Sequence, residues 1–349
     1  MTTSVETIVI RSADAVVHLE YDPATLLPLD RMEYCSEDEQ WTRFVCVSDT
    51  HGNAFPIPDG DVLLHSGDLT DYGTLEEFTT IMEWLYELPH KTKIIIAGNH
   101  DLTLHRDWYE DCWERWHDNK EDYDKIMELL TGDRAKQAGI VYLQNETFTF
   151  SVAPGRRSWT VYGSPWSPYF YDWAFNYRRT EAEPLIASFS STDILLTHAP
   201  PAGILDCTDG RDFAGCKAVS SHLASGRLRP RLHLFGHIHE SHGAYVHNWE
   251  NRDQKCKIPQ AQNKFYGSEG DDLFYEVDGS DYNEVQQELQ LQKELLEAKN
   301  ADPSVQRSVF VNAANQPAGL GRWLEVGDDD IEVPPGGQNF RPVIVDLKE

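Results

Sequence analysis

The strongest constraint on the fold is a series of five short, unbroken runs of β-branched and aliphatic residues. Each run has the length of one strand, and none shows the polar alternation of a half-exposed strand, so each predicts a buried strand. The runs are Phe44–Ser48, Val62–His65, Ile94–Ala97, Ile194–Thr197 and Leu232–Phe235.

A helix is predicted between the second and third runs. Thr74 and Glu77 have the spacing of a capping box, apolar residues then recur on one face, and Pro89 ends the helix. A strand, a helix and a strand in this order predict a crossover unit, which is typical of an α/β fold.

Further strand candidates lie outside these five runs. They are Val141–Phe150, Trp159–Tyr162, Val309–Val311 and Val343–Val345. Because these are too many strands for one small sheet, the sequence predicts a four-layer αββα sandwich of two mixed β-sheets flanked by helices.

The chain of 349 residues is predicted to hold one large domain at residues 43–349. Residues 1–42 form a lead-in packed on that domain, with one possible strand at Ala15–Leu19. Gly, Asp and Glu become dense in residues 249–308, so this segment is predicted to be an acidic, partly helical insertion with a helix at Glu284–Lys299.

Net charge limits the kinds of partner. Lys and Arg total 30 against 58 Asp and Glu, which gives a formal charge of −28. Such a surface repels phosphates and anionic lipids, so it argues against binding to a nucleic-acid polymer or a membrane. A small phosphate substrate is not excluded, because bound metal ions can reverse the local sign of a pocket.

We expect a cytoplasmic location. No stretch is long and apolar enough to span a bilayer, and the N-terminus lacks the basic patch and apolar core of a secretion signal. The cysteines are scattered without a CxxC pair, as expected for free thiols in a reducing compartment.

Each of the five runs ends in residue types that bind metal ions. The clusters are Asp49-Thr50-His51-Gly52, Gly67-Asp68, Gly98-Asn99-His100-Asp101, Thr197-His198-Ala199-Pro200 and Gly236-His237-Ile238-His239. One such cluster alone usually forms a turn or holds a hydrogen-bonded histidine. Five in order, each at a strand end, predict a single metal site at the carboxyl ends of the strands, where glycines allow close backbone approach.

The series resembles the calcineurin-like metallophosphoesterase superfamily, whose blocks run D-x-H, G-D, G-N-H-[DE], H and G-H-x-H. Three other stretches resemble its metallophosphoesterase-domain-containing branch. They are Phe44–His51, Gly163–Trp166 and Phe310–Ala314.

The resemblance implies a site for two metal ions. It makes Asp49, His51 and His239 the ligands of one ion and Asn99, His198 and His237 the ligands of the other, with Asp68 bridging both. Some members of the branch have lost the first histidine of the last block, whereas this chain keeps His237.

Such a ligand set supports phosphoester chemistry on charge grounds. Two carboxylates leave two divalent ions with an excess charge of +2, which attracts a phosphoester and lowers the pKa of a bridging water, so that hydroxide can attack in line. Imidazole ligands favour Mn, Fe, Zn or Co over Mg.

His100 is the predicted catalytic residue, because it directly follows the ligand Asn99. It would protonate the leaving oxygen or steady the phosphate; the alternative is that it only hydrogen-bonds a neighbour and shapes the turn. Asp101 is predicted to orient His100. His242 lies close after the last block and could reach the pocket.

Aromatic residues are dense from Trp166 to Tyr177 and are followed by Arg178 and Arg179. They could stack a nucleobase while an arginine meets the phosphate, or they could pack the core, which we favour for most of them. Trp166, Arg178 and His242 are the substrate-binding candidates.

The expected function is hydrolysis of a small phosphoester, preferably a phosphodiester, and the resemblance suggests cyclic nucleotides. A phosphomonoesterase or protein phosphatase is the enzymatic alternative, disfavoured because residues 69–73 lack the V-D-R-G continuation of protein phosphatases. A non-catalytic scaffold that binds a protein through the acidic insertion is a further alternative, but such relatives lose ligands and this chain keeps them.

Overall fold

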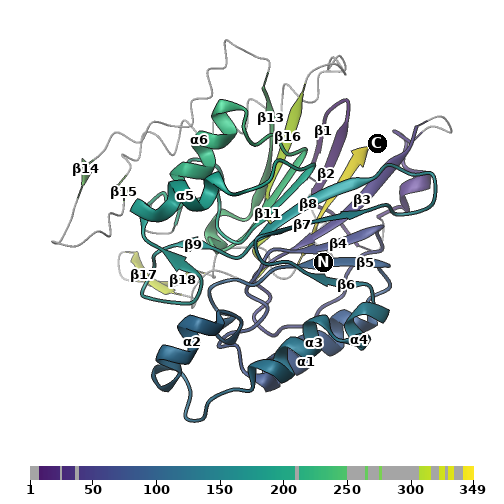
Figure 1. Cartoon of the computed structure of the whole chain (residues 1–349). Coiled ribbons are helices and arrows are strands. Elements are labelled where there is room, and N and C mark those ends of the chain that lie inside the picture. Colours follow the sequence, from purple (N-terminus) through teal and green to yellow (C-terminus); the bar gives the residue numbers. More distant parts are fainter. Residues whose placement is uncertain are drawn as a thin grey trace.

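The computed structural model contains two large β-sheets that pack face to face, with helices on their outer faces (Figure 1). It describes residues 8–23, 26–35, 39–208, 212–249, 306–315 and 341–349 (residues 8 and 20 by their backbone alone), together with the backbone of four short strands at 264–265, 275–276, 322–326 and 329–333.

One sheet has seven strands in the order β1-β2-β19-β3-β4-β5-β6. Their bounds are β1 Ile8–Arg11, β2 Ala15–Glu20, β3 Trp41–Val47, β4 Val62–His65, β5 Thr92–Ile95, β6 Ile140–Tyr142 and β19 Val343–Lys348. Strands β3 to β6 are parallel, whereas β19 runs antiparallel to both β2 and β3. The lead-in and the C-terminal strand therefore belong to the same sheet as the first three metal-ligand clusters.

The other sheet has six strands in the order β13-β16-β12-β11-β8-β7. Their bounds are β7 Glu146–Phe150, β8 Trp159–Ser164, β11 Ile194–Thr197, β12 Leu232–Phe235, β13 Gly243–Asn248 and β16 Arg307–Asn312. Strands β8, β11, β12 and β16 are parallel, and the edge strands β7 and β13 are antiparallel to their neighbours.

Side chains alternate between two cores along each central strand. In β3, Phe44 and Cys46 pack between the sheets, while Val45 and Val47 pack under the helices. Helices α1 Leu75–Glu87, α3 Tyr123–Thr131 and α4 Asp133–Gln137 cover the seven-stranded sheet, and α5 Ala182–Ala187 and α6 Lys217–Ser225 cover the six-stranded sheet. The predicted four-layer αββα sandwich is confirmed.

The remaining elements are short. They are α2 Arg106–Cys112, the 3-10 helices Leu29–Arg31, Leu102–Leu104, Trp113–Arg115, Arg179–Glu181 and His239–Ser241, and the paired strands β9 Ser167–Pro168 with β10 Asn176–Tyr177, β14 Lys264–Phe265 with β15 Tyr275–Glu276, and β17 Arg322–Val326 with β18 Asp329–Val333.

Most predicted elements agree with the structure. The Thr74 hydroxyl accepts from the Glu77 backbone N–H and completes the predicted capping box of α1. One prediction is wrong: Val141–Phe150 is not a single strand, because it divides into β6 and β7, which belong to different sheets. Asn145 makes the turn between them at φ 60°, in the left-handed conformation that asparagine adopts more readily than most residues.

The predicted insertion at 249–308 is described only in part. Its ends belong to the six-stranded sheet, since the Trp249 backbone N–H donates to the carbonyl of Gln306 and β16 begins at Arg307. The helix predicted at Glu284–Lys299 lies outside the described residues.

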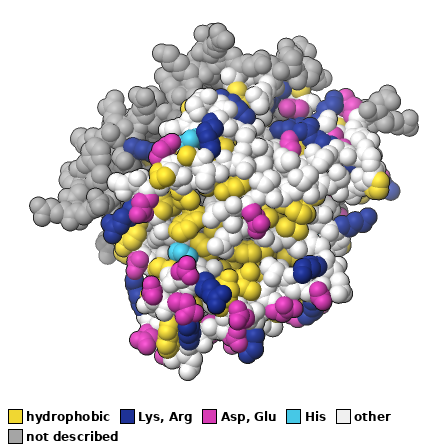
Figure 2. Space-filling model, in the orientation of Figure 1, with side chains coloured by type: hydrophobic (Ala, Val, Ile, Leu, Met, Phe, Trp, Pro, Cys, Tyr) yellow, Lys and Arg dark blue, Asp and Glu magenta, His cyan; other side chains and the backbone are white. Residues whose placement is uncertain are grey.

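Acidic side chains gather over α1, α2 and α3 on the face that Figure 2 shows, in line with the net charge of −28. Within the described part of the chain, no helix is both long enough and apolar enough to cross a membrane.

Candidate metal centre

The five predicted clusters meet at one end of the sandwich, between the two sheets. Three follow β3, β4 and β5 of the seven-stranded sheet, and two follow β11 and β12 of the six-stranded sheet. Backbone hydrogen bonds join the loops: Asp49 N–H donates to the Gly67 carbonyl at 2.9 Å, and Gly236 N–H donates to the His198 carbonyl at 2.9 Å. Between the two sheets, the His237 backbone N–H donates to the Asp49 carboxylate at 3.0 Å, which holds residues 188 positions apart in the sequence side by side.

Asp49, His51 and His239 form one group whose ligand atoms all lie within 4.8 Å of one another. The Asp49 carboxylate is fully buried; it lies 3.1 Å from His239 Nε2 and accepts the His237 backbone N–H at 3.0 Å. His51 Nε2 is buried and has no hydrogen-bond partner among the described residues. An unpaired buried nitrogen beside a carboxylate fits a metal ligand, since such a group is otherwise costly.

Asp68, His198 and His237 form a second group within the same 4.8 Å limit. His198 Nδ1 lies 2.9 Å from the Ser66 carbonyl, which can only accept, so Nδ1 carries a proton. His198 Nε2 lies 2.9 Å from Asn99 Oδ1 and 3.3 Å from Asp68 Oδ2. Two acceptor oxygens and an imidazole nitrogen thus converge, which is favourable only when a proton or a metal ion lies among them.

The two groups are adjacent. The His51 and His239 rings lie 5.4 Å apart between centroids, the His198 and His237 rings lie 4.9 Å apart, and His51 Nε2 lies 3.9 Å from Asp68 Oδ2. Asp68 therefore contacts members of both groups, as a bridging carboxylate must.

Four of these residues have left-handed backbones although none is glycine. The φ angles are 51° at Asp49, 46° at His51, 52° at Asp68 and 69° at His237. Such conformations are strained for residues with a Cβ atom and are found mostly where function requires them. Here they turn each side chain from the strand direction into the space between the sheets.

Two glycines allow the loops to approach the carboxylates. A Cβ atom at Gly98 would collide with the Asp68 carboxylate, and one at Gly236 would collide with the Asp49 carboxylate. Glycine at these positions is a packing requirement of the site.

The electrostatics of the site favour bound cations. Burial alone would raise the pKa of Asp49, but the hydrogen bond with His239 and the nearby His198 hold it well below its usual range. Burial alone would lower the pKa of His198, yet Asp68 raises it to about 9. Burial lowers the pKa of His237 to about 3, so this imidazole is neutral and its lone pair is free to bind a metal.

His100 lies at the edge of the centre. Its backbone N–H donates to Asp68 Oδ1 at 2.8 Å, and its ring lies 4.7 Å from that of His51. Its Nδ1 lies 2.8 Å from the Asp71 carbonyl, so Nδ1 carries the proton and Nε2 presents a lone pair when the ring is neutral. Burial lowers the pKa of His100.

Asp101 does not orient the His100 ring, contrary to the prediction. One carboxylate oxygen accepts the backbone N–H groups of Gly98 and Leu69, and the other accepts the backbone N–H and hydroxyl of Thr70. Asp101 thus joins the loops after β4 and β5. The prediction failed because sequence adjacency does not show that a side chain folds back on its own loop.

The three substrate-binding candidates occupy different places. Trp166 packs against Phe175, with ring centroids 5.8 Å apart, and the exposed Arg178 lies 6.0 Å from the Tyr169 ring. His242 Nδ1 lies 2.9 Å from the Ala314 carbonyl, and burial lowers its pKa to about 4. Their roles in substrate binding remain predictions.

Three further residues at the centre were not singled out from the sequence. Asp71 Oδ1 lies 2.9 Å from His51 Nδ1, the Trp173 ring lies 4.1 Å from the His100 ring, and the Phe170 ring lies 6.5 Å from the His237 ring. His51, Asp71 and His100 also form a third group of possible metal ligands. The position of Asp71, three residues after Asp68, was the available signal; the aromatics were hidden in a segment full of them.

Comparison with known proteins finds relatives that carry a metallophosphoesterase name. Metallophosphoesterase domain-containing protein 1 of Homo sapiens and that of Mus musculus are each 39% identical to this chain over 218 residues, which are 58% of this chain and 62% of each relative. The chain thus matches about three fifths of the length of these curated relatives. A protein of Emericella nidulans named probable rhamnogalacturonate lyase C is 38% identical over 208 residues, but these are only 18% of its length.

A match to a family model covers more than half of the chain, which is enough to assign the chain to a family. The model of calcineurin-like phosphoesterases matches residues 42–241, a range that holds all seven predicted ligands and His100. The chain belongs to the calcineurin-like phosphoesterase family.

Proposed function

We propose that this protein hydrolyses phosphoesters with the help of two divalent metal ions. The observation that carries the proposal is the pair of adjacent ligand groups, Asp49/His51/His239 and Asp68/His198/His237, with Asp68 between them. The family match supports the same chemistry.

The donor set suits transition-metal ions. Asn99 completes the second group, because its amide oxygen lies 2.9 Å from His198 Nε2. Imidazole and carboxylate ligands together favour Mn, Fe, Zn or Co over Mg, and we propose manganese as the first ion to test. When bound, two such ions supply Lewis-acid polarisation of the phosphate and activation of the attacking water.

His100 is the proposed proton donor for the leaving oxygen. Its Nδ1 is tied to the Asp71 carbonyl, so the ring presents Nε2 as the group that can exchange a proton with the substrate. The Trp173 ring, 4.1 Å away, shields the imidazole from water. Its lowered pKa means that the proton is released readily once it is held.

We propose a small phosphodiester as the substrate, with cyclic nucleotides as the first class to test. The net charge of −28 disfavours a nucleic-acid polymer as substrate. We further propose that the protein acts in the cytoplasm. Binding of a protein partner to the acidic segment 249–308 is a separate proposal.

The test compares a phosphodiester with a phosphomonoester reporter after chelation and reloading with Mn, Co, Ni, Zn or Mg. We expect turnover of the diester with at least one transition ion and about two ions bound per chain. A strong preference for the monoester would overturn the diesterase assignment. Fewer than one bound ion per chain, with no turnover of either ester, would instead favour a non-catalytic protein.

A further inference from the structure

Exposed aromatic side chains are concentrated at the mouth of the metal centre. Among the side chains that the structure describes, the large hydrophobic ones that are exposed are Leu27, Tyr72, Phe170 and Tyr171. The last three are all aromatic, and ring contacts connect them to the predicted metal centre. Large apolar groups left in water at a site mouth are typical of surfaces that a ligand covers.

Phe170 and Tyr171 form one side of this mouth. The Phe170 and His237 rings are perpendicular with centroids 6.5 Å apart, and Tyr171 packs against Phe170 at 4.6 Å. Phe170 is 40% exposed and Tyr171 is 70% exposed. Part of the surface of each ring is therefore available to a group bound next to His237.

Tyr72 and Trp173 form the other side. The Trp173 ring lies 4.1 Å from the His100 ring, and Tyr72 stacks on Trp173 at 6.2 Å with an interplanar angle of 26°. Tyr72 is still 50% exposed, so part of its side chain remains available to a ligand. Phe170 thus contacts the ligand His237, and Trp173 contacts His100, whose ring packs against the ligand His51.

The loop that presents these rings is strained and anchored. Tyr171 and Asp172 have φ angles of 47° and 57°, which are unfavourable for residues other than glycine. Arg115 holds both, since Nη1 lies 2.8 Å from Asp172 Oδ2 and Nη2 donates to the Tyr171 carbonyl at 3.2 Å. The fold therefore fixes two aromatic rings in water at the site mouth rather than burying them.

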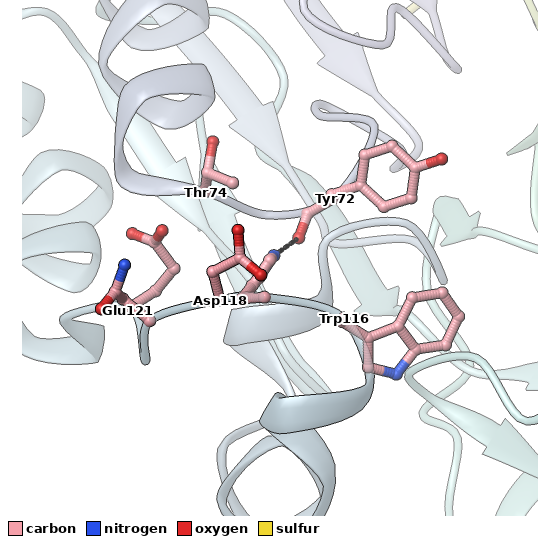
Figure 3. Close-up of a pocket in the computed structure, with 7 residues that line it drawn as sticks. Tyr72, Thr74, Trp116, Asp118 and Glu121 are labelled. Atoms are coloured by element: carbon pink, nitrogen blue, oxygen red, sulfur yellow. Dashed lines mark hydrogen bonds between the residues drawn. The ribbon is translucent and has the colours of Figure 1, made fainter.

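A pocket of about 440 Å³ begins at the same aromatic group (Figure 3). Tyr72 and Trp116 lie on one side of it, and the carboxylates of Asp118 and Glu121 lie on the other. Trp116 also packs on Trp173, at 4.5 Å. The acidic side disfavours a second phosphate, so the part of a substrate that extends here should carry no negative charge.

We propose that Tyr72, Phe170 and Tyr171, with Trp173 beneath them, form a subsite that stacks a flat aromatic group of the substrate, either a nucleobase or an aryl ring, while the phosphoester lies at the metal ligands. The inference rests on the proposed function and narrows its substrate class. Stacking suits any flat ring, because each presents a π-face to the aromatic side chains.

The test measures binding rather than turnover, on protein loaded with Mn²⁺. The probes are phosphonates, whose P–C bond resists hydrolysis: phenylphosphonate against methylphosphonate, and the 5′-phosphonate analogue of AMP against that of ribose phosphate. Calorimetry should show at least one aromatic member binding about tenfold more tightly than its partner, as expected for one stacked ring. A preference only in the nucleotide pair identifies a nucleobase, and one only in the phenyl pair identifies an aryl ester.

Variants test whether the preference for aromatic probes depends on the Phe170 and Tyr171 rings. Phe170→Leu and Tyr171→Leu should each reduce the aromatic preference severalfold, whereas Phe170→Tyr keeps a ring and should retain it. Leu27→Ala changes an exposed apolar residue in the lead-in and is the control. Equal affinity within both probe pairs in the wild type overturns the subsite, and so does a preference that survives the combined Tyr72, Phe170 and Tyr171 leucine variant. If the protein hydrolyses diesters but does not prefer the aromatic probes, only this inference fails. If it prefers the aromatic probes but hydrolyses no ester, only the hydrolase proposal fails.

Discussion

Two clusters of buried polar side chains lie in the same fold, and they differ in whether the protein completes them by itself. Arg43 and Asp346 face each other across β3 and β19, and the guanidinium donates to both carboxylate oxygens at 2.8 Å. Tyr34 also donates to this carboxylate, and a further Arg43 N–H donates to the Leu27 carbonyl at 2.8 Å. One negative charge meets one permanent positive charge, and each of the three guanidinium nitrogens donates to an acceptor.

The metal centre has the opposite balance. Asp49 and Asp68 are equally buried, but the groups around them are imidazoles, which can lose their protons. His51 Nε2 has no partner among the described residues. The comparison teaches that burial alone does not mark a candidate functional site: the candidate site lacks a permanent positive charge, and bound metal ions would supply one.

The same substitution made in both clusters should separate these roles most clearly. Asp68→Asn removes the carboxylate shared by the two ligand groups, so we expect loss of at least one metal ion per chain and of all measurable phosphoester turnover. Asp346→Asn should bind metal as the wild type does. Metal analysis and a reporter assay on both variants check this, and wild-type turnover by Asp68→Asn would refute the two-metal assignment.

His100 should matter less than the shared carboxylate, because its proposed role is to transfer a proton rather than to hold both ions. His100→Ala is expected to lower kcat by about 10²–10⁴-fold, the range for a general acid. The loss should be largest for esters with a poor, alkoxide leaving group and smallest for p-nitrophenolate, which needs no proton. An equal loss for both leaving groups would indicate instead that His100 steadies the phosphate.

The free energy of unfolding should depend more on Asp346 than on Asp68, which is the reverse of their expected effects on turnover. Asp346→Asn leaves the Arg43 guanidinium buried without a counter-charge, and this group cannot deprotonate, so we expect a loss of about 3–5 kcal/mol in the free energy of unfolding. Metal-free Asp68→Asn should lose less, because His198 can release its proton. Chemical denaturation of both metal-free variants measures this difference, and a larger loss in Asp68→Asn would contradict it.

The convergence of the five ligand blocks could be predicted from the sequence, whereas the pairing of Arg43 with Asp346 could not, for a physical reason. Each ligand block follows an apolar run that reads as a strand, and parallel strands bring such ends together, so residues as distant as Asp49 and His239 could be grouped. Arg43 and Asp346 sit inside strands at the two ends of the domain. Their pairing depends on the register of β19 against β3, which no local pattern encodes.

The outward position of two aromatic side chains and the partners of Asp101 could not be predicted from the sequence either. The aromatic segment was favoured as core packing, and Phe175 is indeed buried, but Phe170 and Tyr171 turn outward because the backbone is left-handed at Tyr171 and Asp172. A composition rich in rings does not reveal such a turn. Asp101 was placed near the centre correctly, but its partners are backbone N–H groups of two loops.

Acid should weaken the Arg43–Asp346 pair, and comparison with the Asp346→Asn variant should reveal the loss of stability. Burial alone would raise the pKa of Asp346, but Arg43, His18 and Tyr34 hold it below its usual value. A carboxyl with a lowered pKa in the folded state stabilises the fold above its unfolded pKa, about 3.9, and loses that contribution as the pH falls through the folded value. The difference in unfolding free energy between wild type and Asp346→Asn should therefore be constant above about pH 5 and shrink below about pH 4, as the wild-type carboxyl gains a proton. Denaturation of both metal-free proteins from pH 3 to pH 7 measures this difference. The metal-ligand residues are the same in both proteins, so their own titration cancels when the two are compared.

A difference that grows towards low pH would mean that the Asp346 carboxyl has a raised pKa, and that Arg43 does not hold it charged.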